Sequence, residues 1–405
     1  MKWLILFKGG VETQEYFSME MSHTFEQNGY QIYWYDLMLQ EESARILMEF
    51  YNSHREEEFV AYTFNFNGIA GEKGLYPEDG TNSFWEKTGI PVFNMVVDHP
   101  LYYHKYEPYL PTRYWQISID RNHVDYLRRF SPQVAIIEDG FLPLGGTALC
   151  EQVAMPEGRK YLPISERPID VIFTGNYTPP HTFERFLSGM DQDYIDFYHS
   201  LVAEAIENTE ETIEALAESA MKREIGEMTD QQLKMCMPNM SFIDLSVRFH
   251  YRAEVIRTLV EHGIEIDVYG AGWDLLDCEH PENLKIHGSV NSQECLDQIS
   301  QAKLSINVMP WFKDGAHDRI FNSMLNGAVA VTDGSRYLRQ EFTDGLDLTF
   351  YDLKRLEQLP DMLKDLLSDE DRLQQIADQA YEHCSKEHTW AHRTQSVLQW
   401  MKKVL

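Results

Sequence analysis

Residues 306–351 constrain the fold more than any other part of this sequence, because a strand, a loop, a helix, a strand and a second loop are predicted there in succession. The apolar runs at 304–308 and 328–331 predict two buried strands. The helix predicted between them presents an apolar side and stops at Asn326-Gly327. Ligands of open α/β sheets bind beyond the carboxyl ends of the strands. Both polar loops occupy that edge, so the block is predicted to bind a ligand, with phosphate as the leading candidate.

The same alternation of strands and helices continues over the rest of the chain. Strands are predicted at 3–7, 31–35, 59–64, 92–97, 114–119, 134–137 and 170–174, and segments with helical spacing lie at 16–26, 41–51 and 123–130. This order predicts an α/β protein with mostly parallel sheets. A Pro-Glu-Gly stretch at 156–158 predicts a connector between two domains with a cleft between them. The acidic segment 190–240 predicts a solvated helical insertion in the second half.

Composition limits the classes of partner. The 405 residues carry a formal charge of -30, which argues against nucleic acids and anionic membranes as partners. The first apolar run, at 3–7, is too short for a signal peptide, and no run approaches the roughly 18 apolar residues of a membrane span. The five cysteines are scattered without metal-ligand spacing. We therefore expect a cytoplasmic protein with reduced thiols, no structural zinc and no integral membrane insertion.

Polar and glycine residues follow several of the predicted strands of the second half. Gly175 and Asn176 end one strand, and Gly270 and Gly272 follow another, where a third glycine of a dinucleotide fingerprint is missing. These two loops are predicted to form turns at the rim of the cleft. A helix that begins near Gly315 would offer free backbone N–H groups to phosphate.

Two loops of the first half contain groups suited to proton transfer and sugar binding. Asp98 and His99 supply a carboxylate and an imidazole that could accept a proton from a hydroxyl, although Asp98 could equally be a helix N-cap or turn residue before Pro100. Tyr102 and Tyr103 begin an aromatic run whose ring faces could pack on sugars. No G-x-S-x-G motif or activated cysteine is present in the sequence.

The segment 318–352 (DRIFNSMLNGAVAVTDGSRYLRQEFTDGLDLTFYD), together with VYGAGW at 268–273 and FTGN at 173–176, resembles the C-terminal domain of GT-B glycosyltransferases. It is most similar to the glycosyl transferases group 1 branch that includes spore-maturation-type proteins. The likeness covers roughly residues 165–400; the first half resembles the family only in its strand pattern and in IPVFNMVVDHP. The resemblance implies two facing Rossmann-like domains. It places an acceptor-side domain at 1–160, with a helix at 388–405 crossing back, and a nucleotide-sugar domain at 161–387 with an insertion at about 185–240.

The resemblance also implies roles for individual residues. Arg319 matches a basic position at the diphosphate, and Asp314 and Asn322 stand where many relatives carry two glutamates with seven residues between them. Glu341 and Asp347 match acidic positions near the second loop. The expected donor-binding residues are Gly175, Asn176, Gly270, Gly272, Trp273, Lys313, Asp314, Gly315, Arg319, Asn322, Asp333 and Glu341, and the expected acceptor-binding residues are Asn65, Asn67, Tyr102 and Tyr103. Asp98 or His99 would be the catalytic base of an inverting enzyme, whereas a retaining enzyme would need none.

The expected function is therefore sugar transfer from a nucleoside diphosphate sugar, with a UDP-sugar favoured, to an unknown protein, glycan or small-molecule acceptor. No permanently bound cofactor and no metal are expected, because a helix N-terminus together with Arg319 could stabilise a leaving diphosphate without a metal ion. Homo-oligomer formation is left open. Two alternatives are a sugar-nucleotide epimerase of GT-B shape and a non-catalytic binding or scaffold protein.

Overall fold

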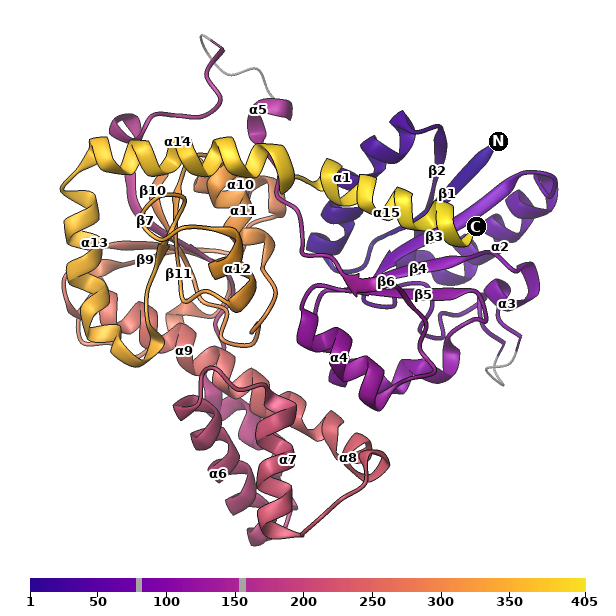
Figure 1. Ribbon diagram of the computed structural model, residues 1–405, viewed down its shortest axis with the longest axis horizontal. Helices are drawn as coiled ribbons and strands as arrows, with labels where there is room; N and C mark the ends of the chain where they lie inside the picture. The colour runs from indigo at the N-terminus through magenta and orange to yellow at the C-terminus, as the bar shows by residue number, and fades with distance from the viewer. Residues whose placement is uncertain (78–81, 153–157) are drawn as a thin grey trace. The chain divides into compact units, whose positions relative to one another are not determined.

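The computed structural model describes residues 1–77, 82–152 and 158–405, which divide into two compact units (Figure 1). Unit 1 comprises Met1–Gly145 and Trp390–Leu405, and unit 2 comprises Gly146–Thr389. The connector predicted at 156–158 lies outside the described residues except for Gly158. Among the described residues, no helix is long and apolar enough to cross a membrane.

Unit 1 contains a six-stranded parallel sheet in the order β2-β1-β3-β4-β5-β6. Its strands are β1 (Lys2–Lys8), β2 (Tyr30–Asp36), β3 (Glu58–Phe64), β4 (Val92–Val96), β5 (Tyr114–Ser118) and β6 (Ile136–Phe141). Its helices are α1 (Glu12–Gln27), α2 (Gln40–Ser53), α3 (Phe84–Thr88), α4 (Arg121–Phe130) and α15 (Trp390–Val404), with a 3-10 helix η2 at Pro100–Tyr109. The central strands are buried on both faces, as parallel sheets covered by helices require.

The last helix of the chain, α15, belongs to unit 1. The ring of Trp390 lies 4.6 Å from that of Phe17 on α1, centroid to centroid. Arg393 Nε donates a hydrogen bond of 3.1 Å to the carbonyl oxygen of Leu144. These contacts attach the C-terminal segment to the first half of the sequence (Figure 1).

Unit 2 contains a second six-stranded parallel sheet in the order β12-β11-β10-β7-β8-β9. Its strands are β7 (Ile169–Thr174), β8 (Ile266–Tyr269), β9 (Leu284–Gly288), β10 (Ala302–Asn307), β11 (Val329–Thr332) and β12 (Thr349–Phe350). The helices of this unit include α5 (Leu149–Gln152), α9 (Ser241–Glu261), α10 (Ser292–Ile299), α11 (Asp318–Leu325), α12 (Arg336–Glu341), α13 (Leu359–Leu367) and α14 (Glu370–Glu387). The two parallel sheets confirm the predicted α/β class.

The acidic segment forms the predicted helical insertion. Its helices are α6 (Gln192–Glu207), α7 (Ile213–Glu224) and α8 (Asp230–Cys236), which extend away from the sheet of unit 2 beside α9 (Figure 1). Leu201, Met221 and Leu233 are buried between them. The insertion therefore has a small apolar core of its own, and its charges lie on the outside, as predicted.

Candidate functional site

The loops after β7 and β8 touch through their backbones, and glycine makes this contact possible. Gly175 N donates a 2.8 Å hydrogen bond to Tyr269 O, and Ala271 N donates one of 2.9 Å to Asn176 Oδ1. A Cβ on Gly270 would lie only 2.3 Å from Gly175 O. Only glycine fits at this position, so the strand-end glycines hold the two loops together. The Asn176 side chain takes part in the same contact.

Trp273 packs against these two loops from the protein core. Its side chain is fully buried, its Nε1 donates a 2.8 Å hydrogen bond to Gly175 O, and its ring stacks on Tyr177 at 5.2 Å. The structure thus places Trp273 in the core beneath the loops, where it fixes the backbone of Gly175.

Two buried arginines flank the loop after β7. Arg319, near the start of α11, donates a 2.8 Å hydrogen bond from Nη1 to Asn307 Oδ1, and its guanidinium lies 5.3 Å from the centre of the Phe173 ring. Arg252, on α9, donates a 2.6 Å hydrogen bond from Nη1 to Asn176 O. Each of these arginines is only 7% exposed. Long cationic side chains are rarely buried without an anionic partner.

The buried arginines repel one another. Burial, followed by the like charges of Arg319 and Arg248, holds the pKa of Arg252 well below its ordinary value. Burial also lowers the pKa of Arg319, and Asp318 offsets part of that effect. Arg248 lies one helical turn before Arg252, forms a 3.3 Å ion pair with Asp244 and stacks over Trp311 at 4.2 Å. A bound anion would relieve the repulsion within this arginine cluster, Arg248, Arg252 and Arg319.

The start of α11 is capped by side chains. His317 Nδ1 accepts a hydrogen bond of 3.3 Å from Arg319 N and lies 2.7 Å from Asp318 Oδ1. Burial would raise the pKa of Asp318, but His317 and Arg319 together lower it below its ordinary value. The first turn of this helix therefore already contains one carboxylate, and Arg319 is the group that supplies the positive charge.

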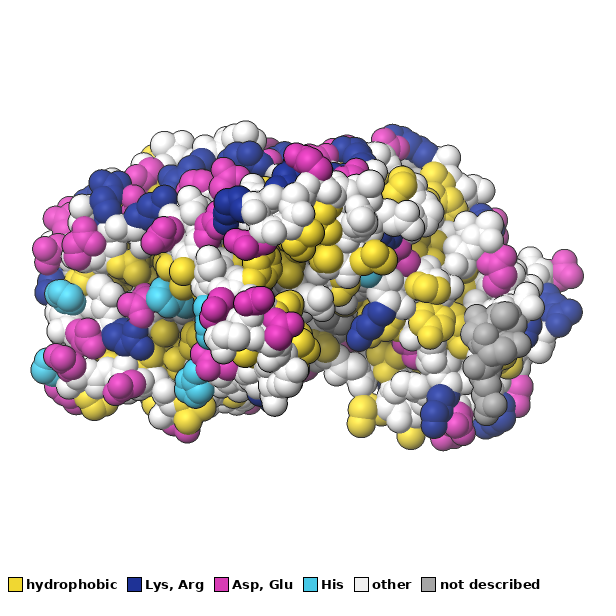
Figure 2. All heavy atoms as spheres, turned by 90° about the horizontal axis from the view of Figure 1, so that it is seen from below, with side chains coloured by type: hydrophobic (Ala, Val, Ile, Leu, Met, Phe, Trp, Pro, Cys, Tyr) yellow, Lys and Arg dark blue, Asp and Glu magenta, His cyan; other side chains and the backbone are white. Residues whose placement is uncertain are grey.

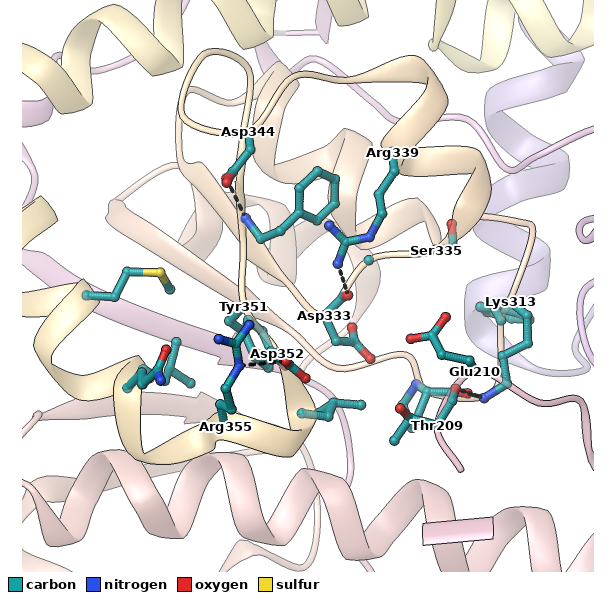
Figure 3. A pocket seen from close by; sticks show the side chains of 18 residues that line it. Thr209, Glu210, Lys313, Asp333, Ser335, Arg339, Asp344, Tyr351, Asp352 and Arg355 are labelled. Carbon is teal, nitrogen blue, oxygen red and sulfur yellow. Dashed lines mark hydrogen bonds and ion pairs between the residues drawn. The ribbon is translucent and has the colours of Figure 1, made fainter. Parts of the chain in front are cut away.

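A cavity of about 660 Å³ opens at the carboxyl ends of β10, β11 and β12 (Figure 3). Its lining includes Lys313, Asp333, Ser335, Arg339, Tyr351, Asp352 and Arg355. Met309 N donates to both carboxylate oxygens of Asp333 at 3.0 Å. Burial raises the pKa of Asp333 to about 7. We call this cavity the strand-end pocket.

The two loops singled out in the sequence meet at this pocket. Ser335 Oγ donates a 2.6 Å hydrogen bond to Gly315 O, which joins the loop after β11 to the loop after β10. Lys313 Nζ donates to the carbonyl oxygens of Thr209 and Pro310. Asp314 lies 3.6 Å from Arg336 Nε. The structure thus brings both predicted polar loops to one edge of the sheet.

Two residues expected at the donor have other neighbours. Asn322 Oδ1 accepts a 2.9 Å hydrogen bond from Thr147 N, and its Nδ2 donates one of 2.9 Å to Asp318 Oδ2. Glu341 lies at the far end of α12, where its Oε1 is 3.4 Å from His388 Nε2. Both side chains are therefore engaged with protein groups outside the lining of the strand-end pocket.

Sequence reasoning missed Arg248 and Arg252. They lie four residues apart on one face of α9, a spacing that was visible in the sequence. Nothing in that spacing distinguishes two arginines beside a binding site from two solvated charges on a long helix. Their position beside the loop after β7 became visible only in the structure.

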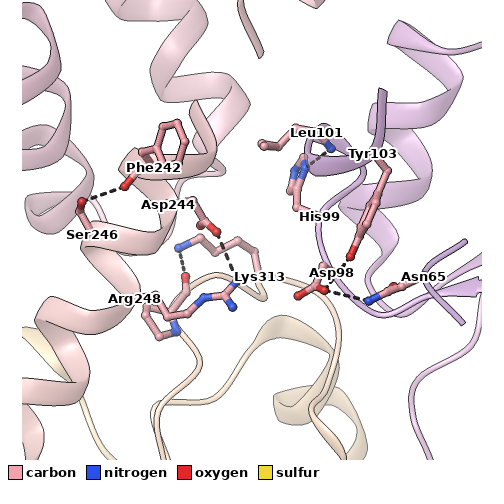
Figure 4. A network of polar contacts seen from close by, with 11 residues as sticks. Asn65, Asp98, His99, Leu101, Tyr103, Phe242, Asp244, Ser246, Arg248 and Lys313 are labelled. Carbon is pink, nitrogen blue, oxygen red and sulfur yellow. Dashed lines mark hydrogen bonds and ion pairs between the residues drawn. The ribbon is translucent and has the colours of Figure 1, made fainter. Parts of the chain in front are cut away.

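In unit 1, Asp98 is held by two neighbours, as the right-hand part of Figure 4 shows. Its Oδ2 accepts hydrogen bonds from Asn65 Nδ2 at 3.0 Å and from the Tyr103 hydroxyl at 2.9 Å. Asn65 Oδ1 in turn accepts from Val97 N at 2.8 Å. Asn67 lies apart from this network, because its Nδ2 donates to Gln14 Oε1.

His99 caps a helix. Its Nδ1 accepts a 3.1 Å hydrogen bond from Leu101 N at the start of η2 (Figure 4). Its ring lies 4.6 Å from that of His123. The side chain is buried. The N-cap considered for Asp98 is thus His99, one residue later. Tyr102 lies on the same 3-10 helix, with its ring 6.3 Å from that of Tyr103.

The chain was compared with protein-family models, with curated proteins and with solved structures. Residues 252–399 match the family model described as glycosyl transferase-like. A comparison with curated proteins found no significant match.

Several solved structures are similar over almost their whole length. An alpha-glucosyltransferase in complex with UDP-glucose and DNA containing an abasic site is 11% identical in sequence. The alignment covers 98% of each chain and has a TM-score of 0.54. HepE of Anabaena in complex with UDP-glucose is 10% identical, covers 100% of each chain and has a TM-score of 0.51. Sucrose-phosphate synthase from Thermosynechococcus elongatus is 9% identical, covers 100% of this chain and 99% of that one and has a TM-score of 0.52. These likenesses bear out the expected fold.

Proposed function

We propose that this protein, whose fold is that of the GT-B glycosyltransferases it is similar to, is itself a glycosyltransferase. The donor is a nucleoside diphosphate sugar, with uridine as the favoured nucleoside, and unit 2 binds it. The observation that carries this proposal is the arginine cluster, in which Arg252 and Arg319 are buried on either side of the loop after β7. The complexes of the similar alpha-glucosyltransferase and HepE with UDP-glucose favour uridine.

The arginine cluster suits the chemistry of sugar transfer. The reaction breaks the bond between the anomeric carbon and a phosphate oxygen, and the bonding electrons pass to the leaving diphosphate. Guanidinium groups bind phosphate oxygens through paired N–H donors, and the effect is strong where water is excluded. Preorganised positive charge stabilises the developing negative charge of the leaving group. Arginines can supply this charge themselves, so we propose a metal-independent transfer.

The strand-end pocket is the proposed nucleoside site. It adjoins the loop after β10, and its lining combines hydrogen-bond acceptors with positively charged side chains. The carboxyl groups of Asp333 and Asp352 are suited to accept hydrogen bonds from ribose hydroxyls. Gly175, Asn176, Gly270 and Gly272 are proposed to shape the backbone near the diphosphate, and Lys313, Asp314 and Gly315 to form the adjoining loop.

The acceptor side is proposed to lie in unit 1. Asp98 is the proposed base if the transfer inverts, because Asn65 and Tyr103 orient its carboxylate. His99 is proposed to position this loop through its capping hydrogen bond. The acceptor remains a protein, a glycan or a small molecule. The similar alpha-glucosyltransferase was solved with DNA, but the charge of -30 disfavours DNA for this chain. On the face shown in Figure 2, basic side chains are interspersed with acidic ones.

A thermal-shift comparison of UDP, GDP, CMP and dTDP tests the donor proposal, because a ligand that binds only the native state raises the melting temperature. UDP is expected to give the largest shift. A larger shift with GDP would overturn the choice of uridine, and no shift with any diphosphate would overturn the donor site.

Incubation with UDP-sugars then tests the reaction. Transfer to an acceptor in the presence of EDTA is the expected result. Formation of an epimer without an acceptor would instead indicate a sugar-nucleotide epimerase, and binding without turnover would indicate a scaffold protein.

A further inference from the structure

Four side chains where α12 and α14 end form a cluster that the proposed transfer does not use. Glu341 is the last residue of α12, His383 and Glu387 lie in the last turns of α14, and His388 follows that helix directly. One carboxylate oxygen or imidazole nitrogen from each residue lies within 4.8 Å of all the others. We propose that these four residues, the His-Glu cluster, bind a divalent transition-metal ion, with Zn²⁺ as the first candidate.

The separations within the cluster suit a tetrahedral ion. Zinc binds imidazole nitrogen and carboxylate oxygen at about 2.0–2.2 Å, which puts neighbouring ligand atoms roughly 3.3–3.6 Å apart. Glu341 Oε1 lies 3.4 Å from His388 Nε2 and 3.7 Å from His383 Nε2. Small rotations of these side chains would therefore complete the coordination. Imidazole ligands favour zinc, cobalt, nickel or copper over magnesium and calcium.

A second carboxylate lies near one of the imidazoles. Asp347 Oδ1 lies 3.7 Å from His383 Nδ1, on the side of the ring opposite to the Nε2 atom that faces Glu341. Asp347 is itself fixed, because its Oδ2 accepts a 2.8 Å hydrogen bond from Thr343 N. A carboxylate beside the second nitrogen is the usual companion of a metal-bound histidine, since it selects the tautomer and increases the basicity of the ring.

The other imidazole is fixed by packing. His388 is 2% exposed, and its ring stacks on Phe321 with a centroid distance of 4.9 Å and an interplanar angle of 6°. Phe342 lies against both histidines, at 4.8 Å from His383 and 5.3 Å from His388. Glu387 is exposed, so an ion could enter from its side.

A site with four protein ligands is closed, and closed sites are structural rather than catalytic. The ion would join the end of α12 to the end of α14. In the sequence, the cysteines lack the spacing of zinc ligands, and we therefore expected no structural zinc. The ligands proposed here are histidines and glutamates instead. The proposal does not depend on the proposed donor, because none of the four residues lines the strand-end pocket.

Zinc titration of the full-length protein tests the proposal. The protein is stripped with a chelator, dialysed and titrated with Zn²⁺ by calorimetry, and Co²⁺ is added separately to follow tetrahedral coordination by its visible absorption. We expect one equivalent to bind and the melting temperature to rise with zinc. His383→Ala should lower zinc affinity at least ~100-fold, and Asp347→Asn should lower it ~10–100-fold.

His280→Ala is the matched control, because His280 is an exposed histidine 3.1 Å from Glu282 and outside the cluster. It should bind zinc as the unaltered protein does. Circular dichroism of each metal-free variant separates lost binding from lost folding, and Glu341→Gln provides a second, milder removal of one ligand. Unchanged zinc affinity in His383→Ala, or no stoichiometric binding by the unaltered protein, would overturn the proposal. Either result would leave the cluster as a set of ion pairs alone.

Discussion

Arg252 and Arg319 approach the loop after β7 from two different helices. Arg252 Nη1 donates to Asn176 O at 2.6 Å, and Arg319 Nη2 would lie 3.2 Å from a Cβ on Gly175. Both guanidinium groups are almost fully buried, and the charge of Arg319 contributes to the lowered pKa of Arg252. Such a pair is unfavourable by itself and becomes favourable when an anion binds between the two charges.

The first prediction concerns this pair. Arg252→Met should weaken UDP binding ~10–100-fold, because a hydrogen bond to a charged group contributes about 1.5–3 kcal/mol. Arg319→Ala should likewise abolish the UDP-induced thermal shift. The unliganded Arg252→Met protein should melt within ~4 °C of the unaltered one, because the variant removes a desolvated charge together with one hydrogen bond.

Arg257→Met is the control for this prediction. Arg257 lies on the same helix, but it donates to Asp277 O instead of to the loop after β7. The UDP affinity of the Arg257→Met variant should equal that of the unaltered protein. If both arginine variants of the cluster kept the full UDP shift, the placement of the diphosphate would be wrong.

The second prediction separates Asp98 from His99. Asp98→Asn should lower kcat ~10²–10⁴-fold if the enzyme inverts, because a general base contributes that much, and it should leave UDP binding unchanged. His99→Ala should instead cost about 0.5–2 kcal/mol of stability through loss of the cap at η2.

Steady-state kinetics and thermal unfolding measure the two effects separately. His99→Asn retains an N-cap group and should recover most of the stability. Normal kcat in Asp98→Asn would exclude Asp98 as the base and would favour a retaining reaction.

The third prediction concerns pH. Burial raises the pKa of Asp333 to about 7 in the folded protein, whereas the pKa of an aspartate in an unfolded chain is about 3.9. The folded state therefore binds the proton more tightly, and stability declines as the pH rises from about 4 to about 7. The Asp333→Asn variant has no titratable group at this position. Its free energy of unfolding, relative to that of the unaltered protein, should therefore increase between about pH 4 and about pH 7 and level off at higher pH. Urea unfolding of both proteins between pH 4 and pH 8 measures the difference. A difference that does not change with pH would show that Asp333 is ionised throughout.

The sequence predicted most of the strand ends well, because apolar runs and the glycines after them depend on local patterns, but β6 ends at Phe141 and not at the predicted residue 137. Gly175, Gly270 and Arg319 all lie at the predicted edge of the second sheet. Arg252 could not be placed from the sequence, because its contact with Asn176 spans 76 residues and arises from the packing of α9 against the sheet. The same applies to Glu341, which follows the predicted loop in sequence but lies beside His388 at the other end of α12.

The last prediction concerns Asn322, where the resemblance to glycosyltransferases led us to expect a glutamate. The Asn322 amide donates to Asp318 Oδ2 and accepts from Thr147 N, so it needs both a donor and an acceptor. A glutamate there would replace the donor by a second negative charge beside the buried Asp318 carboxylate. Asn322→Glu should therefore destabilise the protein by about 1–3 kcal/mol, the range expected when a buried polar group loses its partner.

Asn322→Gln keeps the amide and controls for the added methylene group, so it should cost less than Asn322→Glu. Asp318→Asn combined with Asn322→Glu should recover part of the loss, because the neutral amide can donate to the new carboxylate. Urea unfolding of the four proteins gives the coupling between the two positions. If Asn322→Glu were as stable as the unaltered protein, the hydrogen bonds of Asn322 would not contribute to stability as proposed.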